Sequence, residues 1–250
     1  MSISPSVFVG SPLKHRAFSV YPPTIGDMLE DYLMREYLRI FTISQEDIWD
    51  DRQERGLPID KDCPTPFDIL MVQSGNPGDP ASHLIRTGLE KLTRESVIVS
   101  PEHRIILFKS EGWEQVEDLQ DARCIADNET YFDFQNMGRQ AFGEEIIPPP
   151  EVEENPRLAA LKAKMRQSKR LLKTAKRPDG LSFSTSLNIL CHLGLGLNPI
   201  NLRQLPYASV GPLIEMGINK ERFMIDSIAL ATHADPKKIK PKSWIKNPDD

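Results

Sequence analysis

The pattern of apolar and polar positions along most of the chain is that of helices. Over residues 25–41, apolar side chains recur at spacings of three and four, and charged side chains fill the other positions. This period predicts one amphipathic helix with a single apolar face. Pro22 and Pro23 end the extended segment before it, and Thr24 is a helix-capping residue. The helix is therefore expected to begin at residue 25.

Similar patterns predict further helices, and several of them follow a capping residue. Ser44 with Asp47 forms a capping-box pattern, and Thr65 stands before a proline at the first helical position. Asn201 is expected to cap a helix that Gly217 ends. The predicted helices cover residues 45–55, 67–73, 81–94, 127–138, 156–177, 182–193, 202–216 and 219–233.

Near residue 97, the spacing of apolar positions changes from that of helices to that of strands. Two β-branched runs, 97–99 and 105–108, flank a four-residue turn and predict a β-hairpin. A further short strand is expected over 112–116, and residues 1–23 are expected to be extended or weakly stranded. The fold class is therefore predicted as mainly α with a small β-hairpin, that is, α+β.

Charge divides the chain at a proline-rich segment. Residues 1–154 hold 14 Lys and Arg against 29 Asp and Glu, whereas residues 155–250 hold 17 against 7. The reversal coincides with Pro148-Pro149-Pro150 and the glutamates after it. We therefore expect an acidic N-terminal α+β domain at 1–147, a linker at 148–155 and a basic helical domain at 156–250.

Composition bounds the class of protein. The 250 residues are 39% hydrophobic and 27% charged, which is typical of a globular chain. No apolar run approaches the roughly 20 residues of a membrane span, and the first residues do not match a secretory signal. Cys63, Cys124 and Cys191 are far apart, which favours a reducing compartment over a disulfide framework.

Motifs for catalysis, cofactors or metals are not found in the sequence. It holds no phosphate-binding loop, dinucleotide fingerprint, metalloprotease motif or nucleophile elbow. Cys191-His192 is the sole adjacent Cys/His pair, and adjacent residues of a helix point about 100° apart. Acidic clusters such as Glu46-Asp47 are better explained as helix starts than as metal ligands. The sequence therefore predicts a protein that is not an enzyme and uses no cofactor.

The segment 156–177 is the strongest electrostatic feature. Its nine basic residues include Lys162, Arg166, Lys169, Arg170 and Lys173, and its apolar stripe is thin. Three roles stay open: a connector that docks on the acidic domain, a surface for an acidic protein, and a nucleic-acid-binding helix. Since the segment has no aromatic residue for base stacking, the sequence favours protein contacts over nucleic acid.

Several short phrases, taken in order, resemble one family. They are Thr24-Ile25-Gly26-Asp27-Met28-Leu29, Phe41-Thr42-Ile43-Ser44-Gln45-Glu46-Asp47-Ile48, Thr65-Pro66-Phe67-Asp68-Ile69-Leu70, Asn201-Leu202-Arg203-Gln204-Leu205-Pro206-Tyr207 and Lys242-Ser243-Trp244-Ile245. With the acidic linker and basic helix between them, this layout resembles the tail assembly chaperones of long-tailed phages and prophages of Gram-positive hosts. The resemblance extends over about residues 20 to 246.

The resemblance implies a role in the host cytoplasm and no catalysis. Such chaperones coat the long, hydrophobic tape measure protein before the tail tube polymerises. Apolar grooves with charged rims suit that task, and the predicted helix 25–41 and the helix pair at 202–233 could offer them. Self-association, a virion structural role and a nucleic-acid-binding regulator remain as alternatives. Candidate partner-binding residues are Ile25, Leu29, Tyr32, Leu33, Lys162, Arg166, Lys169, Arg170, Lys173, Tyr207 and Trp244.

Overall fold

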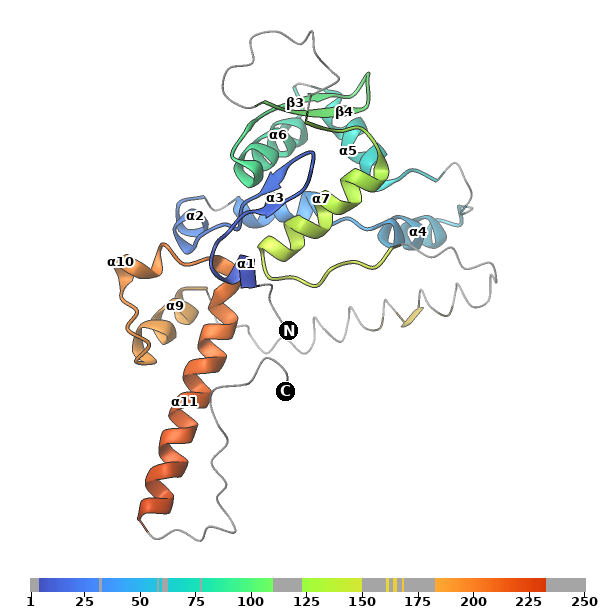
Figure 1. Ribbon diagram of the computed structural model, residues 1–250. Helices are drawn as coiled ribbons and strands as arrows, with labels where there is room; N and C mark the ends of the chain where they lie inside the picture. The colour runs from blue at the N-terminus through green and yellow to red at the C-terminus, as the bar shows by residue number, and fades with distance from the viewer. Residues whose placement is uncertain are drawn as a thin grey trace.

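The computed structural model in Figure 1 is mainly helical with small antiparallel sheets, which confirms the predicted α+β class. It describes residues 5–31, 33–57, 59, 63–76, 78–109, 123–149, 161, 164, 165, 168 and 183–232. The predicted strand at 112–116 and nearly all of the predicted helix at 156–177 lie outside the described residues. So does the linker beyond residue 149.

Capping boxes start three helices at the predicted places. Helices α2 (Ile25–Glu30), α4 (Gln45–Glu54) and α5 (Pro66–Ser74) follow Thr24, Ser44 and Thr65. In each box the cap hydroxyl accepts the amide of the aspartate three residues later at 3.1 Å, and that carboxylate accepts the amide of the cap. Both bonds satisfy amides that a helix start leaves unpaired.

The prediction of one helix over 25–41 is wrong, because the chain breaks at Asp31. Asp31 adopts an extended conformation, with φ −121° and ψ 100°, and ends α2. Its carboxylate accepts the Leu33 amide at 2.9 Å, and its carbonyl accepts the Met34 amide. A new helix, α3 (Met34–Phe41), begins there. An aspartate that bonds the backbone two residues on competes with the helix ladder, which explains the break.

A three-stranded sheet confirms the predicted hairpin. Strands β3 (Ser96–Ser100) and β4 (Ile105–Lys109) are antiparallel, and Val97 pairs with Phe108. A short strand that the sequence did not indicate, β5 (Cys124–Ile125), pairs with β4. The N-terminal segment has a short helix, α1 (Pro5–Phe8), and a small hairpin of β1 (Leu13–Lys14) and β2 (Ser19–Val20).

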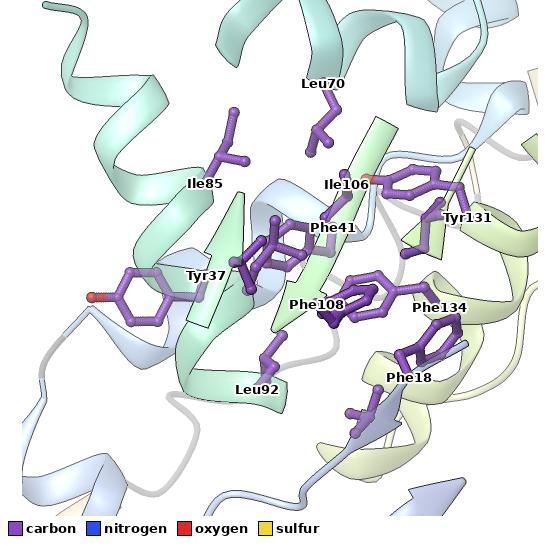
Figure 2. Close-up of a cluster of buried hydrophobic side chains, with 14 of the residues drawn as sticks. Phe18, Tyr37, Phe41, Leu70, Ile85, Leu92, Ile106, Phe108, Tyr131 and Phe134 are labelled. Atoms are coloured by element: carbon purple, nitrogen blue, oxygen red, sulfur yellow. The ribbon is translucent and has the colours of Figure 1, made fainter. Parts of the chain in front are cut away.

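One hydrophobic core joins these elements. Helices α3, α5, α6 (Pro80–Thr93) and α7 (Asn128–Ala141) surround it, together with β2 and the larger sheet (Figure 2). The ring of Phe134 lies at its centre, edge-on to Phe18 and Phe41 at 5.3 and 5.4 Å between ring centroids. Gly88 of α6 lets α3 approach, because a Cβ there would stand 3.0 Å from Phe41. We call this set of buried residues the first core.

The C-terminal helices differ from their predicted bounds in two places. Helix α9 (Phe183–His192) matches the prediction. A short helix, α10 (Pro199–Leu202), is capped by Asn198, and Asn201 is its third residue rather than a cap. After a 3-10 turn, η1 (Tyr207–Ser209), a single helix α11 (Val210–Ala231) replaces the two predicted helices 202–216 and 219–233.

Gly217 does not end a helix but permits a helix contact. A Cβ at Gly217 would stand 2.5 Å from Leu193 Cδ1, so the missing side chain lets the end of α9 lie directly on α11. Around this contact, apolar residues of α9, α10 and α11 form a second core with Ile25 of α2. Its fully or mostly buried members are Ile25, Leu190, Leu202 and Val210.

Backbone hydrogen bonds fasten the second core to α2. The amides of Ile25 and Gly26 donate to the carbonyls of Leu205 and Arg203 at 2.8 and 2.9 Å, and the Tyr207 amide donates to Pro23. Thr24 and Pro206 form an antiparallel bridge. The start of α2 therefore belongs to the C-terminal helices as much as to the N-terminal part of the chain.

Candidate protein-interaction surface

The second half of α11 lies beyond its packing partner. Leu193, the residue after α9, meets α11 at Gly217. In Figure 1, α11 (orange to red) continues from there away from the other labelled helices. Four large apolar side chains on this half are at least half exposed: Ile218 at 50%, Met224 at 52%, Ile225 at 65% and Ile228 at 61%. We call these four residues the α11 stripe.

The α11 stripe continues a row of apolar residues that starts in the second core. Ile214 packs in that core, and Ile218, Ile225 and Ile228 follow at positions that alternate by four and three, with Glu221 at the intervening position. That alternation is the heptad pattern by which one helix packs against another. The stripe is therefore a helix-packing face that the described residues of the chain cover only at its beginning.

Charged side chains border the α11 stripe. Lys220 Nζ donates to the Gly194 carbonyl at 3.2 Å, which holds this lysine beside the end of α9. Glu221 lies within the row, and Arg222 and Asp226 lie to one side of it at about 100° per residue. Both signs of charge therefore border an apolar face, as is common where helices recognise each other.

The structure places the predicted partner-binding residues in different surroundings. Ile25 is fully buried in the second core, whereas Leu29 is 52% exposed on α2. Leu33 and Tyr207 are partly buried against the first core, and the Tyr207 ring lies 5.7 Å from that of Phe183. Of this set, Leu29 is thus the described residue with an exposed apolar side chain. Tyr32, Lys162, Arg166, Lys169, Arg170, Lys173 and Trp244 lie outside the described residues.

The part of the chain that the structure describes holds neither a grouped metal site nor a helix that could cross a membrane. Within it, no three His, Cys, Asp or Glu side chains are grouped as a metal site. None of the helices there combines the length and apolar character needed to cross a membrane.

Comparisons with known proteins identify no relative. Neither models of protein families nor curated proteins nor solved structures match this chain. The surface must therefore be interpreted from its own residues.

Sequence reasoning named the helix pair at 202–233 as a source of an apolar groove, but it did not recognise the α11 stripe as one face because it divided α11 at Gly217. Once residues 210–231 are taken as one helix, the repeat of isoleucines at 214, 218, 225 and 228 is visible in the sequence. The isoleucine repeat was present, but a glycine such as Gly217 often ends a helix. Only the contact with Leu193 shows that this glycine permits close packing inside one helix instead.

Proposed function

We propose that this protein is a tail assembly chaperone, without catalytic activity, that binds a tape measure protein in the host cytoplasm during tail morphogenesis. Two observations support the proposal. The sequence resembles that family in layout, and α11 presents an exposed apolar face with isoleucines at heptad spacing. The second observation carries the proposal, because it supplies a surface on which a partner can bind.

The proposed occupant of the α11 stripe is an amphipathic helix of the tape measure protein. A partner with apolar residues at heptad spacing would bury Ile218, Ile225 and Ile228 between the two helices. Each isoleucine buried in this way contributes roughly 1 to 2 kcal/mol, since each is already partly covered. Lys220, Arg222 and Asp226 would then favour one orientation and register of the partner.

Co-expression of the chain with the tape measure protein of the same phage tests this proposal. We expect the tape measure protein to become soluble and to co-purify with the chaperone. Replacing Ile225 and Ile228 with glutamate should weaken the complex by about a hundredfold or more, because two buried apolar contacts become charges. Titration of a labelled tape measure fragment measures this loss.

Asn219→Glu provides the matched control. It adds the same charge to the same half of α11, but at about 100° per residue it lies on the other side from Ile225 and Ile228. This variant should bind as the wild type does. If the tape measure protein stays insoluble with the wild-type chain, the proposal fails.

Two other outcomes would assign the surface differently. If the glutamate variants turn an oligomer into a monomer and leave partner binding unchanged, the α11 stripe is an interface between copies of this chain. If mass spectrometry finds the protein at stoichiometric levels in mature particles, it is a structural component of the virion instead.

A further inference from the structure

A cavity lies where three helices begin. It has a volume of about 280 Å³ and is bounded by the first residues of α4, α5 and α7 and by the chain that follows α7. Thr65 and Asn128, from two of these helix starts, are joined by a hydrogen bond of 2.8 Å at its edge. The residues that matter for its chemistry are Phe67, Tyr131, Phe132, Gln135, Ile147 and Pro148.

The helix starts do not make this cavity a site for anions. The capping boxes of α4 and α5 place the Asp47 and Asp68 carboxylates on the helix-start amides. At α7, Asp127 accepts the Thr130 amide at 2.7 Å. Each positive helix end is thus already matched by a carboxylate of the chain itself. Glu46 and Glu129 also line the cavity, which disfavours a negatively charged ligand.

Gln135 supplies one hydrogen-bond acceptor that has no partner among the described residues. Its side chain is 98% buried, and its Nε2 donates to the Ile43 carbonyl at 2.8 Å, which fixes the orientation of the amide. Its Oε1 accepts no hydrogen bond from any described residue. Among the described side chains, Arg139 Nε is the one fully buried nitrogen or oxygen that lacks a hydrogen-bond partner. The unpaired Gln135 oxygen is therefore not fully buried. Gln135 also lines the cavity, so a ligand in that space is the group that can donate to this oxygen.

Apolar side chains supply much of the remaining wall. Phe67 and Tyr131 are almost fully buried, with ring centroids 5.2 Å apart, and Pro66, Phe132, Ile147 and Pro148 also line the space. A cavity of about 150 Å³ holds one benzene ring, and drug-sized ligands occupy about 300 Å³ or more. This volume therefore suits a ligand of two fused rings.

We propose that this cavity binds a neutral indole-type group, whose rings fill the apolar space and whose N–H donates to Gln135 Oε1. The indole belongs either to a free small molecule or to a tryptophan side chain of a protein. The site is separate from the α11 stripe, and its existence does not depend on the proposed chaperone function.

The rim of the cavity is fixed rather than free to collapse. The Asn136 side chain bonds both backbone groups of Ile147. The Ile147 amide donates to Asn136 Oδ1 at 2.9 Å, and Asn136 Nδ2 donates to the Ile147 carbonyl at 3.2 Å. A pocket held open in this way loses little entropy when a ligand enters.

Fluorine NMR of the full chain with 5-fluoroindole tests the proposal directly. We expect saturable binding that indole displaces. 1-Methylindole, which has the same rings and no N–H, should displace it about fivefold less well, because it leaves the Gln135 oxygen unpaired. No saturable binding would overturn the site, and equal competition by the two indoles would overturn the role of Gln135.

A pair of neighbouring variants tests the location. Ile147→Phe adds volume at the cavity and should weaken binding at least tenfold, whereas Ile146, which is 56% exposed and does not line the cavity, should tolerate the same change. Thermal melting checks that both variants fold. Unchanged binding by a folded Ile147→Phe protein would contradict the assignment.

N-acetyltryptophanamide distinguishes the two sources of the indole. If it displaces 5-fluoroindole as indole does, the mouth of the cavity admits a tryptophan side chain of a protein. If indole competes and N-acetyltryptophanamide does not, the ligand is a free small molecule.

Discussion

Gly217 of α11 and Leu193 at the end of α9 are in such close contact that a Cβ on the glycine would lie within 3 Å of three Leu193 side-chain atoms. Alanine at 217 should therefore force the two helices apart. We expect Gly217→Ala to lower the free energy of unfolding by roughly 1 to 2 kcal/mol, because the strain exceeds the gain in helix propensity. Urea unfolding measures the change.

Gly211→Ala is the matched control for this prediction. Gly211 lies in the same helix, and a Cβ there would meet no atom within 4 Å. The substitution should leave stability unchanged or raise it by up to about 1 kcal/mol. A stable Gly217→Ala protein would show that the contact with Leu193 can relax at little cost.

Ile25 and Leu29 of α2 should respond differently to truncation. Ile25 is fully buried in the second core, so Ile25→Ala should cost about 2 to 4 kcal/mol of unfolding free energy. Leu29 is 52% exposed, and Leu29→Ala should cost less than about 1 kcal/mol. Denaturant unfolding of the two variants checks this difference. Similar losses in both would contradict the packing of α2 on the C-terminal helices.

Asp31 should matter through its cap and not through its ion pair. Its carboxylate accepts the Leu33 amide, and it also lies 3.7 Å from Lys91 Nζ. Asp31→Ala should cost roughly 1 kcal/mol, the usual loss for a cap. Lys91→Ala removes only a half-exposed ion pair and should cost less than about 0.5 kcal/mol. Equal losses would point to the ion pair as the stabilising contact.

Acid should destabilise the protein partly through Asp68 and Asp127. Burial raises the pKa of Asp68, but hydrogen bonds from Thr65 and the charge of Arg104 outweigh it and leave this pKa below its usual 3.8. The hydrogen bond from the Thr130 amide lowers the pKa of Asp127 in the same direction. The unfolded chain then binds these protons more readily, so the stabilisation is complete above about pH 4 and is lost at lower pH.

Asp68→Asn should make the unfolding free energy less dependent on pH below about pH 5. Arg104→Gln should have a smaller effect in the same direction, because the Thr65 hydrogen bonds remain. Urea midpoints of the three proteins between pH 7 and pH 2.5 provide the measurement. If the unfolding free energy of the Asp68→Asn variant falls with pH as steeply as that of the wild type, this carboxylate does not contribute to the acid sensitivity.

Local sequence patterns predicted the elements that depend on neighbouring residues. The capping boxes at Ser44 and Thr65 and the hairpin around residues 100–104 form where the sequence places them. Each is stabilised by bonds between residues a few positions apart, so its signal is complete within a short window. Strand β5 was missed because two residues carry no period, and it exists through its pairing with β4.

The candidate surfaces could be predicted only in part. The isoleucines of the α11 stripe are visible in the sequence, but their exposure depends on where α9 ends. The cavity could not be predicted at all, since its walls come from three helix starts and from the chain after α7. Nothing in the spacing of these segments indicates that they meet.

The sequence by itself determined that the chain is mainly helical with a hairpin, and where most helices begin, because caps and periodicity act over a few residues. Tertiary structure decided the role of Gly217, which joins two predicted helices because it packs on Leu193 of a distant segment. It also decided that the start of α2 bonds to residues 203 and 205. The break at Asp31 is local, since its carboxylate bonds the Leu33 amide, and periodicity alone did not reveal it. The energy of the tertiary contacts exceeds the small local preference of a single glycine.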